Sequence, residues 1–130
     1  MQFQCDSTGR MPIYRQLIEQ VRQAVATGRI QPGDRLPSVR QLSKELVVNP
    51  NTIARAYTEL EREGVINTRP GLGAFIASPD PGLTAEARGG RLAGLIDGLL
   101  TEAVHLGFSA AEVADLVAQR MRQYQFAGTH

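Results

Sequence analysis

The 130-residue sequence has only one cysteine, Cys5, and two histidines, His105 and His130. A single cysteine excludes an intrachain disulfide and fits a reducing compartment, so we expect a cytoplasmic protein. We interpret Cys5 as a tolerated thiol rather than a redox sensor, because no resolving cysteine or cationic helix end is evident nearby. The histidines have no cysteine or acidic cluster beside them, which leaves too few ligands for a metal site.

Several functional signals are missing as well. The sequence has no nucleophile–base pair and no glycine-rich phosphate loop after a strand, so we predict a non-enzyme without catalytic residues or cofactors. No apolar run approaches the ~20 residues that a membrane span needs, and the N-terminus has no secretory signal pattern. We therefore expect no membrane association. Hydrophobic residues make up 42% of the chain, which is enough to support a core.

Lysine is almost absent, since Lys44 is the only one among 14 basic residues and the other 13 are arginines. Arginine suits bidentate contacts to phosphate or guanine, although a compositional bias of the genome would give the same count. Residues 1–78 hold ten basic and seven acidic residues, a net charge of +3, whereas residues 79–130 hold four and six, a net charge of −2. The positive charge therefore lies in the first part of the chain, as phosphate binding requires.

Apolar spacing and capping residues predict two helices before residue 48. The first spans about 12–27, where apolar residues recur at helical spacing. The second begins at Ser38, where Gln41 is placed to complete a capping box, and ends near 47. Residues 1–10 show no periodic pattern, and we expect a loose arm there, although docking of Phe3 on the domain is the alternative.

A third helix, capped by Asn49, is predicted over about 50–63, and Gly64 with Val65 is placed to end it in a Schellman motif. Its apolar stripe comprises Ile53, Ala56, Tyr57 and Leu60, and the residues roughly opposite are Asn51, Arg55, Thr58 and Arg62. This division of faces is typical of a recognition helix that enters the major groove. It is also typical of a solvated amphipathic helix in a bundle.

Short β-prone runs at 65–69 and 74–77 are joined by Pro70-Gly71-Leu72-Gly73 and predict a β-hairpin. A hairpin directly after a helix-turn-helix is a wing, and a glycine at its tip lets the backbone approach DNA closely. An ordinary hairpin that completes a small sheet is compatible with this interpretation. Separately, Arg35 and Leu36 are predicted to form a very short extended piece before Pro37.

The segment Ser78-Pro79-Asp80-Pro81-Gly82 is a break in composition and predicts a linker. After it, apolar spacing predicts helices over about 84–106 and 109–125, the second opened by a capping box of Ser109 and Glu112. Two helices of this size bury little apolar surface alone, so they need a partner. We expect that partner to be a second copy of the chain, although folding back onto the first domain is the alternative.

The fold class predicted from these patterns is mainly α with a small β-hairpin. A winged helix-turn-helix domain at 1–78 is followed by a linker at 79–83 and a helical dimerisation segment at 84–130. The run from Pro12 to about Ala77 resembles the DNA-binding domain of the GntR family of bacterial transcription regulators. The motifs that carry the resemblance are PGDRLPSVRQLSKEL, NTIARAYTELEREG and PGLGAFI. The short two-helix tail is similar to that of the YtrA subfamily.

The resemblance implies a sequence-specific regulator of transcription, most often a repressor, that binds a palindromic site in double-stranded DNA as a homodimer. It also leaves room for a small-molecule effector whose identity the sequence does not indicate. A winged-helix module that contacts protein or RNA, without operator-specific DNA binding, remains the alternative.

Most of the predicted DNA-binding residues are those that match the family's contact positions. These are Arg35, Ser38 and Arg40 around the second helix, Asn51, Thr52 and Arg55 on the third, and Gly71 in the wing. We add Thr58 from the polar face of the third helix, and Arg69 from its charge beside the wing turn. Some members of the family carry basic residues where this chain has Pro50 and Ala54. Asn51 and Arg55 are therefore expected to carry more of the base reading.

Overall fold

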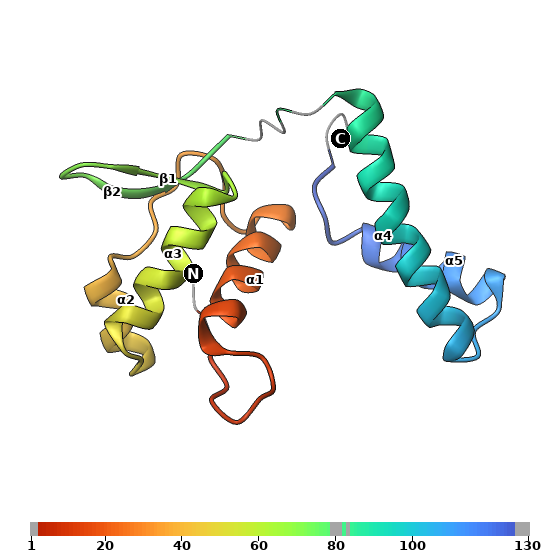
Figure 1. Ribbon diagram of the computed structural model, residues 1–130, viewed down its shortest axis with the longest axis horizontal. Coiled ribbons are helices and arrows are strands. Elements are labelled where there is room, and N and C mark those ends of the chain that lie inside the picture. Colours follow the sequence, from red (N-terminus) through yellow and green to blue (C-terminus); the bar gives the residue numbers. More distant parts are fainter. Residues whose placement is uncertain (1–2, 79–81, 83, 127–130) are drawn as a thin grey trace. The chain divides into compact units, whose positions relative to one another are not determined.

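The computed structural model describes residues 3–78, 82 and 84–126, and the chain divides into two compact units, Met1–Pro79 with Gln125–His130 and Asp80–Tyr124 (Figure 1). In chain order the elements are α1 (Ile13–Ala26), α2 (Val39–Leu46), α3 (Pro50–Arg62), β1 (Ile66–Arg69), β2 (Gly73–Ile76), α4 (Ala85–His105) and α5 (Ala110–Met121). The predicted fold class is confirmed: the described part is mainly helical, with one two-stranded sheet. Of the predicted linker at 79–83, only Gly82 lies within the described residues.

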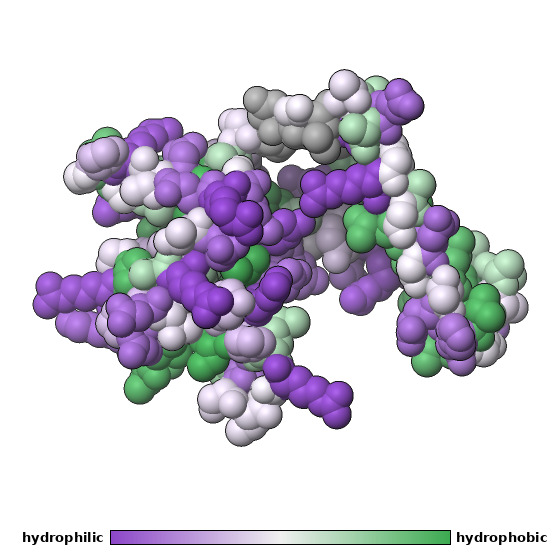
Figure 2. Space-filling view, in the orientation of Figure 1, coloured by the Kyte–Doolittle hydropathy of each residue, from purple (hydrophilic) through white to green (hydrophobic). Residues whose placement is uncertain are grey.

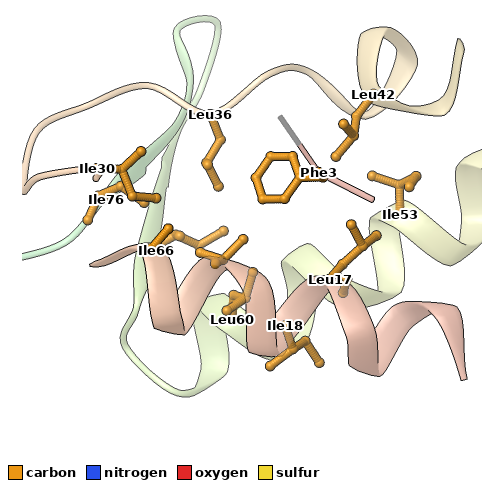
Figure 3. Packing of buried hydrophobic residues seen from close by; sticks show 13 residues of the cluster. Phe3, Leu17, Ile18, Ile30, Leu36, Leu42, Ile53, Leu60, Ile66 and Ile76 are labelled. Atoms are coloured by element: carbon orange, nitrogen blue, oxygen red, sulfur yellow. The ribbon is translucent and has the colours of Figure 1, made fainter. Parts of the chain in front are cut away.

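The core of the first unit forms where α3 packs on α1, with α2 and the sheet closing the sides (Figure 3). The apolar stripe predicted on α3 is buried, since Ile53, Ala56 and Leu60 are all 0% exposed. The remaining buried side chains come from every other element of the unit, from the N-terminal segment and from the connection between α1 and α2: Phe3, Leu17, Ile18, Val21, Ala24, Ile30, Leu36, Leu42, Ile66 and Ile76.

The end of α3 has the predicted Schellman geometry. Gly64 adopts a left-handed φ of 79°, which glycine tolerates without a steric penalty. Its amide donates to the Glu61 carbonyl at 3.0 Å, and the Val65 amide donates to the Leu60 carbonyl at 2.9 Å. These two bonds satisfy carbonyls that the helix end would leave unpaired, and they turn the chain directly into β1.

The start of α2 forms only half of the predicted capping box. Ser38 Oγ accepts a hydrogen bond from the Gln41 amide at 3.0 Å. The Gln41 side chain, however, donates to Glu45 Oε1 at 3.2 Å, one turn further along the helix. An acceptor at the i+4 position therefore replaces the return bond to the Ser38 backbone.

The prediction of a loose arm at the N-terminus is wrong, because this segment packs on the first unit. Phe3 is only 7% exposed and belongs to the core cluster (Figure 3). Two glutamines one turn apart on α1 hold the segment through its backbone. Gln20 Oε1 accepts from the Gln4 amide at 3.0 Å, and Gln16 Oε1 accepts from the Asp6 amide at 2.8 Å. No local periodicity signals this contact, because it depends on side chains that lie 10 and 16 residues away.

The wing consists of β1 and β2, which pair antiparallel with Ile66 opposite Ile76 and Arg69 opposite Gly73. The predicted extended piece at 35–36 lies along the other edge of β2. There the Leu36 amide donates to the Ala74 carbonyl at 2.9 Å, and Arg35 bridges to Phe75. The segment before α2 is thereby tied to the wing.

The second unit is a helical hairpin with no buried residue in either helix. Thr84 caps α4, and the capping box predicted for Ser109 and Glu112 is fully formed at the start of α5. The last helix is shorter than the predicted 109–125, because α5 ends at Met121 and the next residues form a turn. Hydrophobic residues lie exposed along these helices (Figure 2).

We expect Phe3→Ala to lower the free energy of unfolding of the first unit by about 3 kcal/mol, because it leaves a cavity in the core. Urea denaturation followed by circular dichroism measures the change. Met11→Ala, at a position that is 46% exposed, is the matched control and should change stability little. A Phe3→Ala variant as stable as the control would contradict the docking of this segment.

Candidate nucleic-acid interface

The polar side of α3 faces solvent because its opposite side is buried. Asn51, Arg55 and Thr58 are exposed, and Thr52 is half-buried. Arg62, also predicted on this side, is not free, because it donates to Glu59 Oε2 at 2.6 Å through Nη2. The hydrogen bond to Arg62 holds the pKa of Glu59 below its usual value. The available polar surface of α3 therefore lies in its first two and a half turns.

The turn between α2 and α3 is unusual in its backbone. Val47 has a left-handed φ of 54° and is 90% exposed, although β-branched residues rarely adopt this conformation. The Ser43 hydroxyl donates to the Val48 carbonyl at 2.6 Å, and the Val48 amide donates to the Ser43 carbonyl at 3.1 Å. These bonds hold the turn closed and fix how α3 leaves α2.

A second link between α2 and α3 comes from Tyr57. Its hydroxyl donates to the Pro37 carbonyl at 2.7 Å, which ties the middle of α3 to the residue before the α2 cap. Burial, with a smaller contribution from the charge of Glu45, raises the pKa of Tyr57 to about 12. The hydroxyl therefore stays protonated and keeps donating well above neutral pH.

The start of α2 presents Ser38 and Arg40 to solvent. Ser38 Oγ accepts from the Gln41 amide, so its own proton remains available to donate to an anion. The first amides of a helix also lack intrahelical partners and favour negative charge nearby. This combination of groups is suited to holding a phosphate.

Two arginines converge on the wing. The Arg69 guanidinium lies 4.6 Å from the centroid of the Phe75 ring. Arg35 lies over Gly73, where a Cβ atom would come within 2.9 Å of Arg35 Nε. Because Gly73 is paired with Arg69 in the sheet, both cations lie beside the same stretch of β2. Gly71, at the exposed tip, has a left-handed φ of 76°.

The predicted arginines of the interface share one property. In the described part of the chain, none of them has a carboxylate within ion-pair distance, unlike Arg22 and Arg62, which pair with Glu63 and Glu59. They are Arg35, Arg40, Arg55 and Arg69. Unpaired guanidinium groups keep all their donors for an external anion.

The contact between Tyr14 and Arg55 was not predicted from the sequence. The Arg55 Cζ atom lies 3.9 Å from the centroid of the Tyr14 ring, which is carried by the first turn of α1. Tyr14 itself is half-buried against the core. No pattern in the sequence relates residues on two different helices, so only the packing of α1 on α3 could reveal the pair.

The rest of the structure adds two observations about ligands and membranes. Within the described residues, no group of three histidine, cysteine or acidic side chains is arranged to hold a metal ion. None of the helices found there is long and apolar enough to cross a bilayer.

The chain is similar in sequence to known regulatory proteins. Residues 13–76 match the profile described as "Bacterial regulatory proteins, gntR family". The chain is 47% identical to the HTH-type transcriptional repressor YtrA of Bacillus subtilis over 74 residues, which are 57% of each protein. It is 36% identical to the uncharacterised HTH-type transcriptional regulator YhcF of the same organism, over 80% of this chain and 85% of that relative. The match to YtrA thus spans little more than half of that repressor's length.

A solved structure shows a similar domain on DNA. The DNA-binding domain of AraR in complex with operator ORE1 superimposes with a TM-score of 0.50 at 27% sequence identity. The match covers 59% of this chain and 94% of that chain.

Replacing Tyr57 with phenylalanine should lower the free energy of unfolding by about 1 kcal/mol at neutral pH, because the Pro37 carbonyl loses its donor. Since the pKa of Tyr57 rises from 10.0 to about 12 on folding, the contribution of its hydroxyl is complete below about pH 10. It is then lost as the pH rises towards 12. The stability gap between wild type and Tyr57→Phe should therefore narrow over that range.

Urea denaturation at several pH values between 8 and about 12 tests this expectation. Tyr124→Phe, which removes a hydroxyl from the second unit, controls for the general effect of losing a tyrosine. A gap that stays constant up to pH 12 would show that Tyr57 is not shielded in this way.

Proposed function

The chain belongs to the GntR family of bacterial regulatory proteins, and on that premise we propose that it is a sequence-specific DNA-binding regulator of transcription. The observation that carries the proposal is the division of α3. Ile53, Ala56 and Leu60 on its apolar side are fully buried, and its polar side is exposed with Arg55 unpaired by any described carboxylate. A helix held in this way can enter the major groove with its polar side towards the base edges.

The proposed contacts divide into base reading and backbone binding. Asn51 and Arg55, with Thr52 and Thr58, lie on or beside the exposed side of α3, where they would meet base edges. Ser38 and Arg40 at the start of α2, and Arg35 before it, would hold phosphates and set the register. Arg69 and Gly71 would bring the wing to the backbone or the minor groove.

Electrostatics supports DNA over a neutral protein surface. The four predicted arginines, like all arginines of residues 1–78 except Arg22 and Arg62, form no ion pair with a described carboxylate. They belong to a first part whose net charge is +3, whereas the remainder carries −2. A partner that accepts several guanidinium groups must offer regularly spaced anions, as a duplex does. Contacts to RNA or protein through the same face are the alternative.

We infer further that two copies associate through α4 and α5. These helices bury no residue of their own, yet Leu92, Leu95, Leu99 and Val104 are between 47% and 74% exposed. An apolar surface of this kind is unfavourable in water and is typical of an interface. A second copy would cover it, and a two-fold pair of reading helices would select a palindromic operator.

The relative YtrA is named a transcriptional repressor, which supports repression as the outcome of binding, and YhcF is named a transcriptional regulator. A dimer seated on an operator would block access of polymerase to the promoter. A small-molecule effector is compatible with this scheme, and the scheme does not require one.

Arg55→Ala should weaken binding to the selected operator by about 1–3 kcal/mol and relax preference at the base pair that Arg55 reads. Selection of bound duplexes from a random pool identifies the operator, and fluorescence anisotropy over a range of salt concentrations measures affinity. Arg22→Ala, which removes an arginine paired with Glu63, is the matched control and should leave affinity almost unchanged. Unaltered base preference in Arg55→Ala would contradict the placement of α3 in the major groove.

The same selection separates the competing functions. Wild-type protein is expected to enrich a palindrome and to lose affinity steeply with salt, because phosphate contacts release counterions. Enrichment of no duplex sequence would favour the protein- or RNA-binding alternative.

Leu99→Glu should convert the dimer into monomers, because it places a charge in the proposed apolar interface. Sedimentation equilibrium measures the change in association, and operator affinity should fall with it. Met11→Glu, at a similarly exposed position of the first unit, controls for the added charge. If Leu99→Glu stays as associated as the control, α4 does not form the interface.

A further inference from the structure

Arg55 is held by an aromatic ring rather than by an acid. Its guanidinium carbon lies 3.9 Å from the centre of the Tyr14 ring. Glu59, one turn along α3, is the acid best placed to capture it. That carboxylate is already occupied, because Glu59 Oε2 accepts from Arg62 Nε at 3.2 Å and from Nη2 at 2.6 Å. Arg55 forms no ion pair with a described carboxylate, although its charge and that of Glu59 attract each other. The ring therefore orients the guanidinium without occupying its N–H donors.

Whether Arg55 contacts an aromatic ring or a carboxylate decides how many of its N–H donors are available to a base. A carboxylate would accept the same N–H donors that a guanine needs, and would have to be displaced on binding. An aromatic face attracts the cation through its π electrons and leaves the N–H donors at the guanidinium edge available. A guanidinium already confined to one orientation also loses less side-chain entropy when it binds.

Tyr14 is suited to provide a fixed platform. It lies on the first turn of α1 and packs half-buried against the core that α1 and α3 share. Its ring is therefore positioned by the same packing that orients α3. Through Tyr14, the start of α1 therefore comes close to the proposed reading surface of α3.

Resting on the proposed function above, we propose that Tyr14 is a positioning residue for base reading by Arg55. The Tyr14 ring holds the guanidinium stacked on its face, so that the two edge donors meet O6 and N7 of a guanine in the major groove. Arg62 supports this arrangement indirectly, because it keeps Glu59 occupied. Tyr14 thereby influences which base pair is preferred without touching it.

Operator affinities of Tyr14→Leu and Tyr14→Phe, each alone and combined with Arg55→Ala, test the proposal. The affinities are measured on two duplexes. The first is the operator selected by wild type. In the second, one base pair is replaced, namely the pair at the position where Arg55→Ala no longer shows a preference. Tyr14→Leu should reduce operator affinity about 2- to 5-fold and reduce discrimination between the two duplexes. Tyr14→Phe, which keeps the ring face, should retain both. With Arg55→Ala already present, Tyr14→Leu should have no further effect.

Thermal denaturation of each variant separates positioning from loss of folding, and the double variants cancel any general effect on α1. The proposal would be overturned if Tyr14→Leu reduced operator affinity equally in the presence and absence of the Arg55 side chain. It would also be overturned if Tyr14→Phe reduced affinity and discrimination as much as Tyr14→Leu. If wild type selects a palindrome but Arg55→Ala keeps full discrimination, the roles of Arg55 and Tyr14 both fail while the regulator function stands. If wild type selects no duplex, the proposed function itself fails.

Discussion

The burial of one side of α3 is the constraint on which the first unit depends. Ile53, Ala56 and Leu60 have no exposed surface. Truncating the side chain of Ile53 or Leu60 would leave a cavity between α3 and α1. Because the helix cannot rotate without exposing these residues, its other side must face solvent. The capping residues at both ends and the hydroxyl of Tyr57 then hold α3 at a fixed angle to α2. The orientation of the polar surface is thus a consequence of core packing.

The distribution of ion pairs separates two classes of arginine. Arg22 and Arg62 are paired with acids and stabilise the unit only weakly, since both lie at the surface. Three of the predicted interface arginines lie against apolar or backbone surfaces instead: Arg55 over Tyr14, Arg69 over Phe75, and Arg35 over Gly73. These surfaces restrict the side chains but do not neutralise them. Such a pattern favours an external anion, which is why it supports the proposed binding to DNA.

The two units differ in how they are stabilised. The first has a continuous apolar core that recruits even the N-terminal Phe3. In the second, α4 and α5 are well capped but bury none of their own residues, so the local signals are strong while the packing is incomplete. Under the proposed association, a second copy would remove this apolar surface from water. The second unit would then be most stable in the dimer, which is also the form that carries two copies of the proposed DNA-binding surface.

Sequence alone predicted the features that depend on residues within about one helical turn: the fold class, the helix starts at Ser38, Asn49 and Ser109, the Schellman ending at Gly64, and the exposed stripe of α3. Local spacing is sufficient there, because caps and periodicity involve near neighbours. Local spacing did not predict that Phe3 is buried in the core, that the Gln41 side chain donates to Glu45, or that the Tyr14 ring lies against the Arg55 guanidinium. Those contacts depend on which surfaces meet or which of several acceptors is nearest, and only the packed tertiary structure brings such groups together.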